Sequence, residues 1–379
     1  MRKNVRKLLG AAIAVMLTAG LFALAGCSSP TSSSDSPATG SGSSAADVQT
    51  VTDMLGRTVE VPAEVDKVVG IGASSLRMIC YMQSVDKVVG VEQAEQTDSV
   101  TCAYRHVNHD TFTKLPVIGE GGSKGVTANE EAIIAAAPQV IIANLDKDSA
   151  DSLQQKTGIP VVCVTMSDIV FDQKLYDNIT LLGTILGKEE RGKELISYMQ
   201  DTEADLQKRI ENVQTKTAYA AGVSFRGGHG FSGTEAGFAP FAICNITNIA
   251  DAGHDSGCFD IDLEAVTAAQ PDYIFVEGGN LGLVKEDVAA NPDYFSNLNA
   301  VKNGNVYSLV SYRFYATNVE LALANCYHVG SCVYPDRFSD IDSTEKLDEI
   351  TTYFLGAPIS EDLAANGLSF QKFDLMSSN

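Results

Sequence analysis

The chain has 379 residues, of which 45% are hydrophobic and 20% charged, and its formal net charge at pH 7 is −21. An acidic balance of this size opposes binding to nucleic acid or to an anionic lipid surface through charge. The chain has no tryptophan, which disfavours a carbohydrate site built on indole stacking. We therefore expect no nucleic-acid partner.

Residues 1–26 have the pattern of a secretory signal peptide, because four basic residues precede an apolar run that ends in small residues. The run closes with Leu24-Ala25-Gly26-Cys27, which resembles the lipobox of bacterial lipoproteins. The resemblance implies cleavage before Cys27, acylation of its sulfur, and lipid anchoring at the extracytoplasmic face of the cell membrane. The alternative is an ordinary anchor helix, because about 20 apolar residues can span a bilayer.

Residues 27–50 are predicted to be a flexible tether. They consist almost entirely of Ser, Gly, Ala, Thr, Pro and Asp and show no apolar periodicity, so they cannot bury enough surface to fold. The residues that follow are numerous enough for two domains of ordinary size.

Short strands and helices alternate in residues 51–170 and predict a first α/β lobe. Strands are expected at 58–61, 67–70, 87–91, 140–143 and 160–165, and helices at 76–82 and 149–157. A further helix is capped by Asn129 and stopped by Pro138. Residues 171–214 lack strand signals, and apolar residues at helical spacing predict a bridging helical segment there, which Gly187 interrupts.

Residues 215–379 repeat the pattern and predict a second α/β lobe. Strands are expected at 218–224, 272–276 and 305–309, and helices at 241–248 and 263–269. The predicted fold class is thus α/β, with two lobes that have central parallel sheets and are joined by one long bridging α-helix.

Two segments of the chain have similar sequences. NEEAIIAAAPQVII (129–142) and DLEAVTAAQPDYIF (262–275) agree at six of fourteen positions when their prolines, 133 residues apart (271 − 138), are matched. Each copy is followed by a glycine and then a predicted strand, GIPVVCV and GNVYSLV. We interpret the repeat as two lobes of similar design.

Seven cysteines remain if Cys27 is acylated, which is an odd number for an exported protein. Cys326 with Cys332, and Cys244 with Cys258, are possible disulfides. The spacings match no zinc pattern, and we expect the cysteines to be structural.

Several motifs in order resemble the substrate-binding proteins of ABC importers for ferric siderophores, haem and cobalamin, the helical-backbone or class III periplasmic binding proteins. They are DMLGRTVEVPAEVDKVVGIG, the two E-x-x-x-x-x-x-P-[DQ] segments, the long helix, and AVKNGNVYSL followed by YPDRFSD. The likeness covers about residues 51–356. It implies a monomer without a cofactor of its own, which captures an iron or cobalt chelate between its lobes and delivers it to a membrane permease.

In that family, a glutamate seven residues before the proline on each lobe docks onto arginines of the permease. Glu131 and Glu264 match that position, and a carboxylate paired with an arginine fork makes a directional contact. The alternative is that each is a favourable acid in the first turn of its helix. Glu130 leaves a one-residue ambiguity in the first lobe.

Ligands of open parallel sheets bind at loops beyond the carboxyl ends of the strands. The corresponding loops here are 72–77, 101–109, 225–238 and 311–318, and they hold four of the eight arginines that follow the signal peptide. Guanidinium groups pair well with carboxylate or phosphate, so an anionic ligand is expected. The predicted ligand-binding residues are Arg77, Tyr104, Arg105, His106, Arg226, His229, Tyr312, Arg313 and Tyr315. The alternative is that some of these arginines form internal ion pairs, and we expect two of the four to touch ligand.

His229 lies between glycines in RGGHGFSGTE and is expected to be exposed and unhindered. It is a candidate ligand of a haem iron or a corrinoid cobalt; the alternative is a loop histidine that only forms hydrogen bonds. Met78 and Met82 are candidates for a second soft ligand, or core residues at helical spacing. His106 and His109 lack companion acids, so a free zinc or manganese site is not expected.

Rival functions remain. The sequence has no G-x-S-x-G elbow, no G-K-[ST] after its glycine cluster and no H-E-x-x-H, so we do not expect an enzyme. The other alternative is a membrane-tethered sensor or scaffold that keeps the two lobes and binds a protein partner. The glycine-rich insertion is longer than the usual strand-to-helix loop of the family, which suggests a subfamily with its own ligand.

Overall fold

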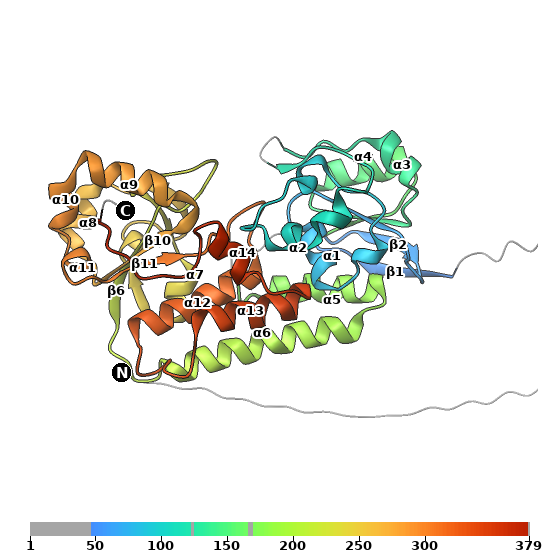
Figure 1. The fold of residues 1–379 in the computed structure, drawn as a ribbon. Coiled ribbons are helices and arrows are strands. Elements are labelled where there is room, and N and C mark those ends of the chain that lie inside the picture. The colour runs from blue at the N-terminus through green and yellow to red at the C-terminus, as the bar shows by residue number, and fades with distance from the viewer. Residues whose placement is uncertain (1–46, 123–124, 166–169, 378–379) are drawn as a thin grey trace, which may run out of the picture. The chain divides into compact units, whose positions relative to one another are not determined.

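Two separate parallel sheets organise the chain. The structure, a computed structural model, describes residues 47–122, 125–165 and 170–377 (Figure 1). The first sheet has the order β3-β4-β5, and the second has the order β11-β10-β6-β8. Their strands are β3 Val68–Ile71, β4 Val140–Ala143, β5 Val161–Cys163, β6 Lys216–Ala221, β8 Ile246–Asn248, β10 Tyr273–Glu277 and β11 Val306–Leu309. The predicted fold class is confirmed, and we call the bodies around these sheets the N-terminal and C-terminal lobes.

The N-terminal lobe buries its sheet completely: every residue of β3, β4 and β5 is buried. Such uniformly apolar strands are typical of parallel sheets that are covered on both faces. The lobe's other elements are β1 Val48–Thr52, β2 Thr58–Pro62, α1 Ser75–Tyr81, η1 Val85–Lys87, η2 Gln93–Gln96, α2 Ala103–Phe112, α3 Glu130–Ala136 and α4 Lys147–Thr157. β1 and β2 form an antiparallel hairpin ahead of the sheet.

Two helices connect the lobes along the chain. α5 (Gln173–Leu186) ends where Gly187 adopts a positive φ of 64°, and α6 (Glu189–Arg209) follows and leads into β6. The helix break at Gly187 is therefore confirmed, and α6 is the long bridging helix (Figure 1). No helix within the described ranges combines the length and apolarity needed to cross a membrane.

The C-terminal lobe contains helices and one small antiparallel sheet besides its parallel sheet. Its further elements are β7 Gly233–Ala236, α7 Ala239–Ile243, η4 Ile249–Asp251, β9 Gly257–Asp260, α8 Leu263–Ala269, η5 Gly278–Asn280, α9 Leu281–Ala290, α10 Pro292–Ser296, α11 Asn299–Lys302, α12 Val319–Val333, α13 Ser343–Leu355 and α14 Ser360–Ala365. β7 and β9 pair antiparallel, so part of the glycine-rich segment is a strand.

Three local predictions were wrong. The strand expected at 87–91 is reduced to isolated bridges at Val88 and Val91. The helix expected at 241–248 ends at Ile243, and residues 246–248 form β8, because they pair with the distant strand β6. The loop expected at 101–109 is largely helix α2, in a stretch without glycine or proline.

The sequence repeat corresponds to a structural repeat. α3 and α8 are both seven-residue helices with a side-chain cap, from Asn129 and Asp262, and both end in a residue with a left-handed backbone. Each packs one fully buried side chain onto its own lobe, Ile133 or Val266. The interpretation of two lobes of similar design follows from these shared features.

The residue after each proline has the same structural task in both lobes. Gln139 Oε1 accepts the backbone N–H groups of residues 66 and 67, just before β3. Asp272 Oδ2 accepts the backbone N–H and the hydroxyl of Thr217 in β6. An amide oxygen and a carboxylate oxygen thus hold the start of the neighbouring strand in the same way.

Neither of the two possible disulfides forms between the described cysteines. Cys326 and Cys332 lie on α12, and six residues at ~100° each turn their side chains about 120° apart. Cys244 is buried, and its thiol donates to the carbonyl oxygen of Cys326 at 3.3 Å.

Candidate functional site

A cavity of about 600 Å³ lies at the carboxyl ends of the C-terminal lobe's strands. Loops that follow β6, β10 and β11 line most of it, and Gly122 of the N-terminal lobe completes the wall. The lining residues are Gly122, Ser224, Phe225, Arg226, Gly227, Gly228, Asn280, Arg313, Phe314 and Tyr315. Three predicted ligand residues are among them: Arg226, Arg313 and Tyr315.

The two arginines of the cavity differ in their surroundings. Arg226 is exposed, and no described carboxylate forms an ion pair with it. Arg313 is half-buried, and its Nε donates to Glu235 Oε2 at 2.8 Å while a second nitrogen contacts Glu235 Oε1. Its guanidinium also lies 5.4 Å from the ring centre of Tyr312. Arg226 therefore offers its charge to a solute, whereas the charge of Arg313 is partly balanced by protein.

Arg77 lies behind the cavity and joins the lobes. Its side chain is buried and donates to the carbonyl oxygens of Phe314, Tyr315 and Thr317 at 2.8–2.9 Å. These carbonyls belong to the loop between β11 and α12. The guanidinium of this predicted ligand residue is therefore engaged with backbone that carries two lining residues.

Tyr104 and Arg105 of α2 also support the cavity from behind. Both are buried, and both donate to the carboxylate of Glu95, from the Tyr104 hydroxyl at 2.7 Å and from Arg105 Nε at 2.5 Å. The guanidinium of Arg105 lies 5.2 Å from the ring centres of both Phe314 and Tyr315. Arg105 thus packs against the rings of two residues that line the cavity.

Tyr312 is buried as well, and its hydroxyl lies 3.5 Å from Glu235 Oε2. Burial raises the pKa of Tyr312 well above its ordinary value, and the nearby Glu235 adds to the shift. Its hydroxyl is therefore protonated at neutral pH and serves as a donor inside the lobe.

His106 connects α2 to α14. Its Nδ1 lies 2.9 Å from Asp98 and its Nε2 lies 3.0 Å from Asp362. Burial alone would lower the pKa of His106, but the hydrogen bonds to the two carboxylates outweigh burial and raise the pKa. The ring thus carries positive charge more readily than a free histidine and links two acids.

The expectation that His229 is unhindered was wrong. Its Nδ1 lies 3.1 Å from Asp260, and its Nε2 lies 2.9 Å from the carbonyl oxygen of Phe225. The ring stacks on Phe225 with centroids 3.6 Å apart. Both nitrogens therefore have partners, and His229 supports the lining residue Phe225.

Sequence reasoning missed three polar residues of this region. Ser224 and Asn280 line the cavity, and Glu277 lies beneath them, with its carboxylate accepting both the N–H and the hydroxyl of Ser224. Burial raises the pKa of Glu277. A signal was present, because the polar residues in Glu277-Gly278-Gly279-Asn280 come directly at the end of a buried strand.

A fourth missed residue is Glu92, which belongs to the N-terminal lobe. It is buried and accepts a hydrogen bond from the Tyr315 hydroxyl at 2.7 Å, so it joins the lobes beside the cavity. Burial raises the pKa of Glu92 to about 7.

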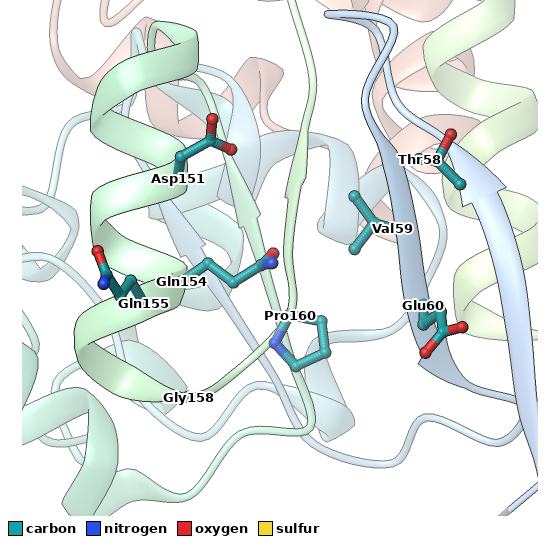
Figure 2. Close-up of a pocket in the computed structure, with 8 residues that line it drawn as sticks. All are labelled: Thr58, Val59, Glu60, Asp151, Gln154, Gln155, Gly158 and Pro160. Atoms are coloured by element: carbon teal, nitrogen blue, oxygen red, sulfur yellow. The ribbon is translucent and has the colours of Figure 1, made fainter.

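A second hollow, of about 740 Å³, lies between β2 and α4 of the N-terminal lobe (Figure 2). It is lined by Thr58, Val59, Glu60, Asp151, Gln154, Gln155, Gly158 and Pro160. Arg57 and Lys147 already bind the Asp151 carboxylate. The hollow contains none of the predicted ligand residues and no aromatic side chain, so the first cavity is the better candidate for a solute site.

The two predicted docking glutamates are both exposed, in the first turns of α3 and α8. Glu130 is half-buried and forms an ion pair with Lys156 at 2.9 Å. No ion pair joins Glu131 or Glu264 to another described residue. Of the two adjacent acids in the first lobe, Glu131 is thus the one whose charge is available.

Within the described ranges, no group of three or more His, Cys, Asp or Glu side chains is arranged to hold a metal ion. Residues 1–46, with Cys27, lie outside the described residues.

A family model described as periplasmic binding protein matches residues 68–312. A periplasmic solute-binding protein from Veillonella parvula DSM 2008 has a similar structure, with 19% identity and a TM-score of 0.66 over 85% of this chain and 97% of its own. The TroA-like periplasmic binding protein FepB from Veillonella parvula has 22% identity and a TM-score of 0.66, over 86% and 99% of the two chains.

The periplasmic molybdate-binding protein MolA from Haemophilus influenzae, bound to molybdate, has 18% identity and a TM-score of 0.63. The match covers 82% of this chain and 98% of that one. No curated protein matches the chain. At these identities the similar structures show a common fold.

Proposed function

The chain belongs to the periplasmic binding protein family, whose members bind small solutes outside the cytoplasm for ABC transporters, and we propose that it serves an importer of iron or cobalt chelates. The resemblance noted from its motifs is confirmed at the level of the family. A ferric siderophore, haem or a corrinoid is the proposed solute, and an ABC permease is the proposed partner.

The observation that supports a chelate is the lining of the 600 Å³ cavity, whose size is usual for small-molecule sites. Arg226 and Arg313 suit carboxylate or other anionic groups. Phe225, Phe314 and Tyr315 offer aromatic surface to the organic part of a chelate. The molybdate bound to the similar Haemophilus influenzae protein agrees with an anionic solute.

Most of the remaining predicted ligand residues support the cavity wall in this proposal. Arg77, Tyr104, Arg105, His106 and Tyr312 hold the cavity wall through the contacts described above. Ligation of the chelated metal by His229 stays a prediction, and it requires the ring to leave Asp260 and the carbonyl of Phe225.

Arg226 provides the sharpest test of the solute site. Thermal shift and native mass spectrometry with haem, cobalamin and several ferric siderophores should identify a solute that stabilises the mature protein. Arg226→Ala should weaken an anionic solute about tenfold, since a charge-assisted contact is worth ~1.5 kcal/mol or more. Arg337→Ala is the matched control, because Arg337 is exposed and lies outside the cavity. A protein that no metal complex stabilises would instead favour the tethered scaffold.

Docking through Glu131 and Glu264 is tested by separating uptake from binding. Glu131→Lys and Glu264→Lys should each reduce uptake into cells at least about tenfold, because a charge-assisted pair becomes a repulsion. Solute affinity should stay unchanged, since both residues lie on helices that do not line the cavity. Glu130→Lys is the control next to Glu131, and uptake at the wild-type level in all three variants would exclude the docking role.

Lipid anchoring at Cys27 completes the proposal. Cys27→Ser should release the protein from the membrane fraction without changing solute affinity, because the tether lies ahead of both lobes. Retention of the variant in the membrane fraction would favour an uncleaved anchor helix.

A further inference from the structure

The orientation of the Asn280 side chain is determined by its neighbours. Nδ2 donates to the carbonyl oxygen of Gly222 at 2.7 Å and to Ser224 Oγ at 2.8 Å. A carbonyl oxygen can only accept, so the nitrogen of the amide must face Gly222. The opposite rotamer would place two acceptors against each other.

The Ser224 hydroxyl strengthens this arrangement. It donates its single hydrogen to Glu277 Oε1 at 2.8 Å, and the backbone N–H of Ser224 donates to the other carboxylate oxygen at 3.0 Å. The hydroxyl therefore presents only a lone pair to Asn280. Both hydrogens of the Asn280 side-chain amide are therefore used, one in the bond to Gly222 and one in the bond to Ser224.

The remaining polar atom of the Asn280 side chain is its amide oxygen, Oδ1. It accepts no hydrogen bond from any described residue. Asn280 is only 7% exposed, yet it lines the cavity. Its Oδ1 lies against Gly228, another lining residue, where a Cβ atom would be 2.8 Å away. The Asn280 side chain is thus nearly buried, and its Oδ1 lies at the wall of the solute site without a protein donor. A solute that covers this oxygen without donating to it leaves the acceptor unmatched, which is costly.

We propose that Asn280 determines solute specificity: its fixed carbonyl oxygen selects a solute that presents an N–H or O–H group at that point, alongside the acceptor groups that Arg226 binds. The inference rests on the proposed solute-binding function and narrows its substrate class. The solute is a chelate whose oxygen atoms accept from Arg226 and whose organic part also carries hydrogen-bond donors, such as amide or hydroxyl groups, rather than a complex with acceptors alone.

A matched pair of iron complexes tests the inference. Iron(III) acetohydroxamate carries N–H groups, and iron(III) N-methylacetohydroxamate replaces each with N–CH₃. The wild-type protein should bind the first about tenfold more tightly, the usual consequence of an unmatched buried acceptor. In Asn280→Leu the ratio of the two affinities should fall below about two.

Asn325→Leu is the control for a merely structural effect. Asn325 is a buried amide whose Nδ2 and Oδ1 are both bonded to Val310, away from the cavity. Its loss should lower stability but leave the tenfold ratio intact. A ratio that stays near ten in Asn280→Leu, or that is near one in the wild-type protein, overturns the inference while the solute-binding function stands.

A second measurement needs no solute. With selective ¹⁵N-asparagine labelling, the side-chain amide protons of Asn280 should exchange with water at least about tenfold more slowly than those of the exposed Asn303, because both are bonded. Equal rates would overturn the inference. If neither iron complex binds the wild-type protein, small iron hydroxamates are excluded as solutes, and the exchange rates still decide the orientation of Asn280.

Discussion

The N-terminal and C-terminal lobes build the same helix–proline–strand unit from segments that agree at only six of fourteen positions. α3 leads into β4 and α8 leads into β10. The two helices have the same length, and each is followed by a residue with a left-handed backbone conformation. What is shared is a set of physical tasks: a side-chain cap, one buried apolar residue, and a side-chain oxygen that holds the neighbouring strand. The comparison shows that two different residue types can perform each task.

The unit also differs between the lobes in one respect. Gln270, the residue directly after α8 in the second copy, accepts the backbone N–H of Asn299 through its side chain, whereas the matching Ala137 in the first copy has only a methyl group. The second unit is thereby bonded to α11, and the first has no such bond.

The largest expected effects come from the buried residue of each helix. Ile133→Ala should destabilise the protein by about 3.5 kcal/mol and Val266→Ala by about 2.5 kcal/mol, because both side chains are fully buried and isoleucine loses one more carbon. Chemical denaturation of both variants measures the difference. A larger loss for Val266→Ala would show that the two lobes do not use this position equivalently.

The second prediction concerns Glu92, the buried acid of the N-terminal lobe beside the cavity, where the C-terminal lobe has the buried Glu277. Because the pKa of Glu92 is about 7 in the folded protein and the ordinary pKa of a glutamate is 4.5, the folded state holds this proton more tightly. Stability from Glu92 is present below pH 4.5 and is lost as the pH rises towards 7, by about 3 kcal/mol.

Glu92→Gln should remove that part of the pH dependence, since glutamine resembles the neutral acid. Denaturation of wild type and variant at pH 4.5 and pH 7.5 gives the difference. Parallel pH profiles would mean that Glu92 ionises as an ordinary glutamate.

Replacing the side chains that hold the neighbouring strands should have a smaller effect. Gln139→Ala and Asp272→Ala should each cost about 1 kcal/mol, because each loses hydrogen bonds to the start of a strand while water can reach the freed groups. Asp272→Asn should recover part of the loss, as its amide oxygen can act like that of Gln139. No recovery would show that the charge of Asp272 is required.

The smallest effect is expected at the ends of the two helices. Ala137→Gly should stabilise the protein by about 0.5 kcal/mol, because φ is 51° there and glycine adopts that backbone without strain. Gln270→Gly should bring no net gain, since it relieves the same strain but loses the bond to Asn299. Thermal unfolding of both variants, with equal gains in each, would contradict the stated difference between the units.

The elements that local sequence determines were predictable. The strand at 140–143 and the helix at 263–269 were predicted with the bounds that the structure has, because apolar spacing, a capping residue and a proline all act within a few residues. β8 was not predictable in this way. Its residues pair with β6, about thirty positions earlier, and that partner cannot be read from the local pattern.

The same limit applies to the candidate site. Arg226 and Arg313 were predicted in cleft loops and do line the cavity. Arg77 came from the same reasoning, yet its partners are carbonyl groups about 240 residues later in the chain. Whether a loop arginine faces a solute or the protein depends on such distant partners, which residue type and position do not reveal.

The hydrogen bonds from Arg77 to three carbonyl groups also have a mechanical consequence. The chain between Leu309 and the start of α12 leaves the sheet of one lobe and is fastened to the first helix of the other. If the lobes turn relative to each other, Phe314 and Tyr315 travel with the lobe to which they are bound by Arg77, not with the strand that precedes them. The twist must then be absorbed by the backbone torsions just after β11.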